Sequence, residues 1–122
     1  MALRYEDDQN VIARAYGRYF RTGDDVLNMI PAVLQLTMNG LYLFDRRRAE
    51  NYQGEMYCHL DIYLSWNDFD MVGQGDAGGK RYLFVPYKDE SPLYTFISDE
   101  DSHKDIKTLL RDIHSIGIPI IS

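Results

Sequence analysis

The chain has 122 residues, of which 45% are hydrophobic and 26% charged, and this composition is typical of one folded domain rather than of a disordered segment. Its formal net charge is −6. A field of this sign repels phosphate backbones, so we expect no nucleic-acid partner. A basic partner protein, or no charged partner, fits the charge better.

The cysteine count and the lengths of the apolar runs exclude several further classes of protein. Cys58 is the single cysteine, which excludes an intramolecular disulfide and a cysteine-based zinc site. The first residues lack the apolar segment of a secretory signal, and no apolar run approaches about 18 residues. We therefore expect a cytoplasmic protein without membrane contact, and no motif indicates a cofactor, a metal site or a catalytic residue.

Apolar residues at helical spacing predict two N-terminal helices. The first, residues 8–21, carries a stripe of period 3.6 made of Ile12, Ala15, Tyr16, Tyr19 and Phe20. The second runs from Thr22 or Asp24 to Met38, and Pro31 inside it predicts a kink or two shorter helices.

The rest of the chain predicts about four strands and one more helix. The strands are residues 41–44, 56–66, 80–87 and 93–98, with a loop or short exposed helix over 45–55 and a long loop over 67–79. A helix follows from Ser102, with Gly117 as its stop signal. The expected fold is a single α+β domain, residues 1–122, whose mainly antiparallel sheet has helices on one face.

Residues 56–66 alternate between apolar and polar side chains and supply the candidate site. Met56, Cys58, Leu60, Ile62, Leu64 and Trp66 should point into the core, which leaves one polar face made of Tyr57, His59, Asp61 and Tyr63. Arg81 or Tyr87 of a neighbouring strand would join that face. An imidazole and a carboxylate on one face suit a binding pocket or acid–base chemistry, and equally an ordinary solvent-exposed surface.

The other patterns predict no chemistry. Residues 73–78 match G-x-G-x-x-G, but a strand rather than a helix follows, so we interpret them as a flexible hairpin loop. The acids Asp68, Asp70 and Asp76 lack the ligand spacing of a calcium loop. Residues 46–48 are three arginines, interpreted as a solvated loop or a contact for an acidic partner.

Two functional hypotheses remain. The first is a non-enzymatic binding module that self-associates as a homodimer or contacts a partner protein, which the ten tyrosines and the apolar residues 118–121 favour. That apolar end should either pack on the sheet or meet another subunit. The second is a small-molecule-binding protein or minor enzyme whose pocket is lined by the polar face of residues 56–66.

Overall fold

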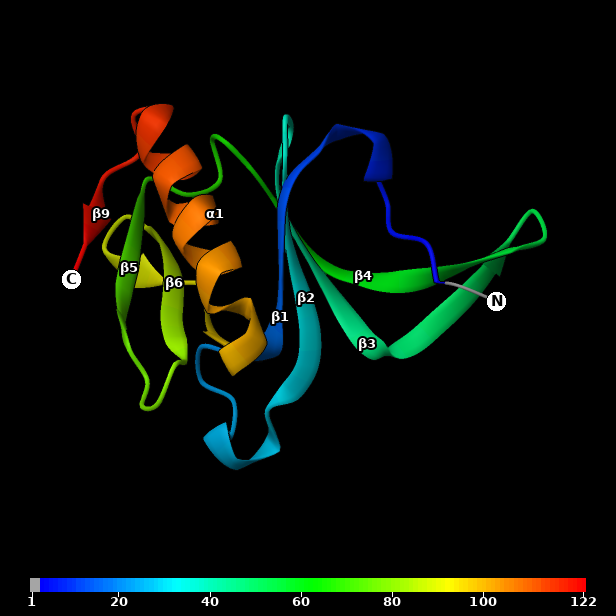
Figure 1. Ribbon diagram of the computed structural model, residues 1–122, viewed down its shortest axis with the longest axis horizontal. Helices are drawn as coiled ribbons and strands as arrows, with labels where there is room; N and C mark the ends of the chain where they lie inside the picture. The colour runs from blue at the N-terminus through cyan, green and yellow to red at the C-terminus, as the bar shows by residue number, and fades with distance from the viewer. Residues whose placement is uncertain (1–2) are drawn as a thin grey trace.

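The computed structural model describes residues 3–122 and contains a large sheet with one α-helix (Figure 1). In chain order the elements are η1 (Asp8–Asn10), β1 (Val11–Arg21), η2 (Val26–Asn28), β2 (Ile30–Thr37), β3 (Gly40–Tyr52), β4 (Glu55–Ser65), β5 (Met71–Asp76), β6 (Tyr82–Lys88), β7 (Ser91–Pro92), β8 (Tyr94–Ser98), η3 (Glu100–Ser102), α1 (His103–Ser115) and β9 (Ile120–Ile121).

The strands of residues 3–122 form one nine-stranded sheet in the order β4-β3-β2-β1-β8-β6-β5-β9, with β7 paired to β6. Every pairing is antiparallel except that of β5 with the short C-terminal β9. The expectation of two N-terminal helices and about four strands is therefore wrong, although the mainly antiparallel pairing and the C-terminal helix are confirmed.

The N-terminal segments are strands, and apolar side chains on both of their faces explain why the sequence predicted helices. In β1 the buried residues are Ala13, Ala15, Gly17 and Tyr19, which alternate with period two. Ile12, Tyr16 and Phe20 lie on the opposite face, and combining the two faces produced a stripe that looked helical. Residues 32–37 of β2 are buried on both faces, so their sequence does not alternate at all.

Pro31 is compatible with β2 because of its position in the ladder. It pairs with Arg18 of β1, while the pairing of β2 with β3 begins only at Ala32. A proline at the beginning of a strand interrupts little of the ladder, so no kinked helix is needed to accommodate it.

Two segments predicted as loops also belong to the sheet. Residues 45–52 continue β3, which pairs with β4 as far as a turn at Gln53 and Gly54. Both turn residues have positive φ, 52° and 84°, as two-residue hairpin turns require. Within residues 67–79, β5 occupies 71–76, and the hairpin turn that follows uses Gly78 and Gly79.

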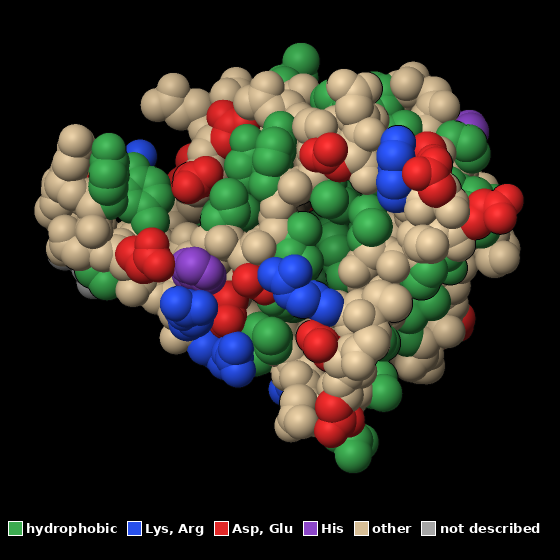
Figure 2. All heavy atoms as spheres, turned by 180° about the vertical axis from the view of Figure 1, so that it is seen from behind, with side chains coloured by type: hydrophobic (Ala, Val, Ile, Leu, Met, Phe, Trp, Pro, Cys, Tyr) green, Lys and Arg blue, Asp and Glu red, His purple; other side chains and the backbone are tan. Residues whose placement is uncertain are grey.

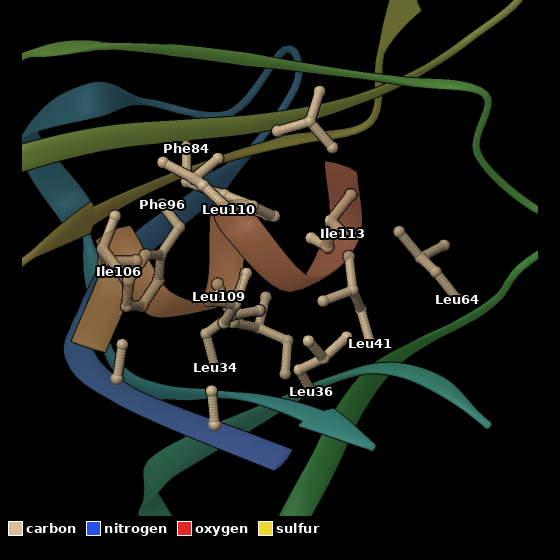
Figure 3. Close-up of a cluster of buried hydrophobic side chains, with 14 of the residues drawn as sticks. Leu34, Leu36, Leu41, Leu64, Phe84, Phe96, Ile106, Leu109, Leu110 and Ile113 are labelled. Atoms are coloured by element: carbon tan, nitrogen blue, oxygen red, sulfur yellow. The ribbon is translucent and has the colours of Figure 1, made fainter. Parts of the chain in front are cut away.

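The main core lies between α1 and one face of the sheet (Figure 3). The helix contributes Ile106, Leu109, Leu110 and Ile113, all buried, and the residues that pack against them include Leu34, Leu36, Leu41, Leu64, Phe84 and Phe96. The predicted helix is thus confirmed, but Ser102 does not cap it, because its Oγ accepts a hydrogen bond from the Tyr16 amide instead.

A second, smaller cluster covers the opposite face of the sheet. It consists of Val33, Tyr42, Phe44 and Cys58, with Tyr5, Tyr16 and Leu60 packed against it. Val33 and Leu34 are neighbours in β2 and belong to different clusters, so the two clusters lie on opposite faces. The sheet is therefore apolar on both sides in its β2–β4 region.

Two bulges bend the β3–β4 hairpin. Leu43 pairs with Ile62 and Phe44 with Leu60, so Asp61 is an extra residue in β4; in β3, residues 46–48 are extra between the pairs Asp45–His59 and Ala49–Cys58. Bulges bend and twist the strand that carries them. Figure 1 shows the far half of this hairpin, residues 46–58, swinging away from α1; we call this half the arm.

The bulge at Asp61 also changes which face β4 presents. Leu64 and Ile62 pack in the main core, whereas Leu60 and Cys58 pack in the second cluster. The prediction that residues 56–66 form a strand is confirmed, but the prediction that its apolar residues all point to one side is wrong, because one inserted residue reverses the alternation.

Candidate functional site

A pocket lies along the arm, where the segment before β1 passes β4. Its volume is ≈ 650 Å³, within the range of small-molecule and side-chain binding pockets. We call it the arm cleft, and its lining residues are Glu6, Asp7, Glu50, Asn51, Tyr52, Tyr57, Cys58, His59 and Leu60.

Backbone pairing brings the distant parts of this cleft together. The hairpin register places Glu50 opposite Tyr57 and Tyr52 opposite Glu55. The Arg4 amide donates to the Met56 carbonyl at 2.9 Å, and the Cys58 amide donates to the Arg4 carbonyl at 2.8 Å. This short bridge on the outer edge of β4 holds the next residues, Glu6 and Asp7, beside the arm.

His59 and Glu50 form the central polar contact of the cleft. His59 Nδ1 lies 2.9 Å from Glu50 Oε1, and the side chains are 24% and 63% exposed, so the histidine is partly covered while the carboxylate faces water. The rings of Tyr52 and Tyr57 meet edge to face, with centroids 6.2 Å apart. The cleft therefore offers a carboxylate, an imidazole and two tyrosine rings within one hollow.

The acids of the cleft differ in how many hydrogen bonds their carboxylates accept. Hydrogen bonds from Asn10, and secondarily from Asn39 and Tyr42, lower the pKa of the Asp7 carboxyl. Asp7 is therefore a fixed anion at neutral pH. Glu6 is exposed, and its carboxylate makes no hydrogen bond or ion pair with residues 3–122.

Cys58 is unsuited to nucleophilic chemistry. Its side chain is buried, and its thiol donates to the Asp45 carbonyl at 3.2 Å. Burial, reinforced by the Asp45 carboxylate, raises the pKa of the thiol and disfavours the reactive thiolate. The sulfur thus belongs to the packing of the second cluster.

Tyr57 and His59 of the predicted polar face line the cleft, but Asp61 does not. Asp61 Oδ1 lies 3.1 Å from the Arg21 guanidinium of β1. Burial nevertheless raises the pKa of the Asp61 carboxyl, because a half-exposed arginine offsets little of the cost of desolvation. Asp61 is instead the bulge residue at which the apolar side chains of β4 change from one face of the sheet to the other.

Tyr63 and Arg81 lie elsewhere. The Tyr63 ring packs on Tyr42, with centroids 4.7 Å apart, and its hydroxyl donates to the Asn39 carbonyl. Arg81 lies before β6, which β3, β2, β1 and β8 separate from β4, so it does not join His59 across the sheet. Arg81 instead lines a smaller pocket of ≈ 350 Å³ with Arg18 and Asp99.

Four residues of the lining, Glu6, Asp7, Glu50 and Tyr52, are not among those predicted from the sequence. The Gln53–Gly54 turn was a usable signal, since a glycine-containing pair between two β-forming runs predicts a hairpin that brings 50–52 against 55–58. No local signal indicated that the residues before β1 would reach the arm.

The three consecutive arginines form the β3 bulge rather than a loop. Arg47 pairs with the buried Asp45 at 2.9 Å, and Arg46 lies over the Tyr16 ring at 5.1 Å. Figure 2 shows Lys and Arg side chains interspersed with acidic ones on this side of the molecule rather than gathered into one large patch. Arg46 and Arg47 therefore contact other residues of the protein, although all three arginines are exposed.

Two classes of site are not found in the part of the chain that the structure describes. Residues 3–122 contain no group of three or more His, Cys, Asp or Glu side chains placed to hold a metal ion. Over the same residues, no helix combines the length and the apolar character needed to cross a membrane.

Comparison of the chain with protein-family models, with curated proteins and with solved structures finds no match.

Proposed function

We propose that this protein is a non-enzymatic binding module and that the arm cleft is where it contacts a partner protein. The observation that carries the proposal is the arm: a bent hairpin projects from the sheet and forms one wall of the arm cleft. Tyr52 is 64% exposed on that wall, and exposed tyrosine beside a pocket is a common feature of binding surfaces.

The chemistry of the cleft favours binding over catalysis. His59 has a carboxylate partner, yet the thiol beside it is buried and held protonated by its surroundings. A pair of this kind can orient a ligand by hydrogen bonds without a nucleophile.

Site-directed photocrosslinking tests the proposal. A photoreactive phenylalanine analogue at position 52 should give one discrete crosslinked protein in extracts of the source cells. The matched control is the same replacement at position 63, a tyrosine 42% exposed and outside the cleft. Equal products at both positions, or none at position 52, would contradict the proposal.

A small-molecule ligand is the second candidate, because the pocket reaches both Tyr57 and His59 and has a suitable volume. It predicts that fragments soaked into crystals of the protein occupy the cleft and contact His59. Fragments that bind only elsewhere would remove this candidate and leave the partner protein.

A further inference from the structure

We infer that the arm cleft receives a cationic side chain, lysine or arginine, from a basic peptide segment. This inference rests on the proposed function and names the chemistry of the partner. The first observation is charge: the lining contains the acids Glu6, Asp7 and Glu50 and no lysine or arginine. A concave acidic surface concentrates cations from solution.

The second observation is the pair of tyrosine rings that the acids accompany. Elsewhere in the fold, tyrosine faces already hold cations: Arg14 lies 4.6 Å from the Tyr5 centroid, and Arg46 and Lys107 lie over other tyrosines. No cation of residues 3–122 lies over Tyr52 or Tyr57. Their edge-to-face arrangement leaves ring surface for a guanidinium or ammonium group.

The third observation is that two carboxylates of the lining keep oxygens without a hydrogen-bond partner among residues 3–122. Glu6 is held by its backbone, since its carbonyl accepts a hydrogen bond from Gln35 Nε2 at 2.8 Å, while its carboxylate is unengaged by residues 3–122. Glu50 uses Oε1 toward His59, and its Oε2 makes no hydrogen bond or ion pair with the same residues. Two such acceptors suit the forked donors of arginine.

The nearby arginines do not neutralise the cleft. Arg4 pairs with Glu55, and Arg47 pairs with Asp45. Arg48 makes no ion pair among residues 3–122, but it does not line the pocket. Glu6 and Glu50 therefore line the hollow without an ion pair to any lysine or arginine of residues 3–122.

The exposure of the lining distinguishes a peptide side chain from a free small molecule. Tyr52 is 64% exposed and the Glu50 side chain 63% exposed, so the cleft cannot enclose its occupant. Pockets for free small molecules bury most of the ligand surface. A cation attached to a chain that continues outside the cleft fits this open geometry better.

The test measures the affinity of a short peptide alternating arginine and glycine by calorimetry, with backbone amide NMR shifts to locate it. We expect shifts at residues 50–52 and 57–60, and affinity that falls with salt. The double variant Glu6→Gln with Glu50→Gln should weaken binding about ten-fold or more, and Tyr52→Leu about three-fold. The matched control, Glu90→Gln with Glu100→Gln, removes the same charge from exposed sites outside the cleft and should change affinity much less.

Three outcomes would overturn the inference. They are equal weakening by the cleft and control variants, equal binding of a glutamate–glycine peptide, and equal binding of free arginine amide, which would assign the cleft to a small cation. A partner crosslinked at position 52 whose yield is unchanged by the double variant would remove the cationic occupant alone and leave the proposed function standing. If the peptide binds the cleft as expected but no partner crosslinks there, only the proposed function fails.

Discussion

Two tyrosines in the main core carry polar atoms that have no partner. Tyr19 and Tyr94 are 0% and 1% exposed, and their rings meet edge to face with centroids 6.3 Å apart. Neither hydroxyl makes a hydrogen bond within residues 3–122. Burial raises the pKa of Tyr94 far above its usual value, so this side chain stays neutral. Burial of the rings stabilises the fold, while the unpartnered hydroxyls offset part of that stabilisation.

Removing either hydroxyl should not destabilise the fold. An unsatisfied buried hydroxyl costs about 1–3 kcal/mol, so Tyr19→Phe and Tyr94→Phe should each leave the free energy of unfolding unchanged or raise it by about 1 kcal/mol. Urea denaturation measures the change. Tyr63→Phe is the control, because its hydroxyl donates to the Asn39 carbonyl at 2.9 Å, and we expect a loss of about 0.5–1.5 kcal/mol. A clear loss in Tyr19→Phe would indicate a buried water or another hidden partner.

At the scale of the element, β1 depends on a close approach to β8. Gly17 pairs with Ser98, and a Cβ added at Gly17 would lie 2.1 Å from the Ile97 carbonyl oxygen. That atom belongs to the backbone of a neighbouring strand and cannot turn aside. β1 joins the two halves of the sheet, β2–β4 on one side and β8, β6 and β5 on the other, so a clash here affects the whole ladder.

Gly17→Ala should therefore be strongly destabilising. We expect a loss of about 2–3 kcal/mol or more, since overpacking against backbone forces the strands apart. Gly75→Ala in β5 is the matched control, because its Cβ would make ordinary contact with Leu83 at 3.7 Å. There we expect a gain of up to about 1 kcal/mol from the reduced freedom of the unfolded chain. Similar values for the two variants, measured by thermal and urea unfolding, would contradict the pairing of β1 with β8.

At the scale of the whole molecule, the C-terminal segment packs in the main core and forms the last strand of the sheet, beside β5. Ile118 is 9% exposed in the main core, the Val72 amide donates to the Pro119 carbonyl at 3.0 Å, and Ile120 pairs with Val72. Of the two alternatives for this apolar end, packing on the sheet is the one observed. Self-association remains a prediction, and this segment no longer argues for it.

Deleting residues 118–122 should lower stability rather than change assembly. Exposing the site of Ile118 costs about 1.5–3 kcal/mol of apolar burial, and β5 loses its neighbour. Light scattering should give the truncated and full chains the same oligomeric state. Removing only Ser122, which is exposed, should have no measurable effect on unfolding. If the truncated chain changed its oligomeric state but kept its stability, the segment would instead belong to an interface between subunits.

The sequence by itself determined the elements whose patterns are local. Residues 103–115 present one apolar stripe, and β4, β6 and β8 appear within one or two residues of where β-forming runs predicted them. When only one face of a helix or strand is covered, the spacing of its apolar residues in the sequence follows the structural period. Of the candidate site, that local pattern supplied Tyr57 and His59.

Only the tertiary structure decided the N-terminal strands, the bulges and the arm cleft. β2 is covered on both faces from residue 32 on, and β1 carries Ile12, Tyr16 and Phe20 on the face opposite its buried residues, so neither sequence shows the alternation of polar and apolar residues that separates a strand from a helix. Asp61 fits the alternation of polar and apolar residues in the sequence, but as an inserted residue it exchanges the faces on which the side chains before and after it lie. Glu6 and Glu50 lie 44 positions apart, and a backbone bridge from Arg4 to β4 places them at one pocket. Contacts at that separation depend on the assembled sheet, so no local pattern encodes them.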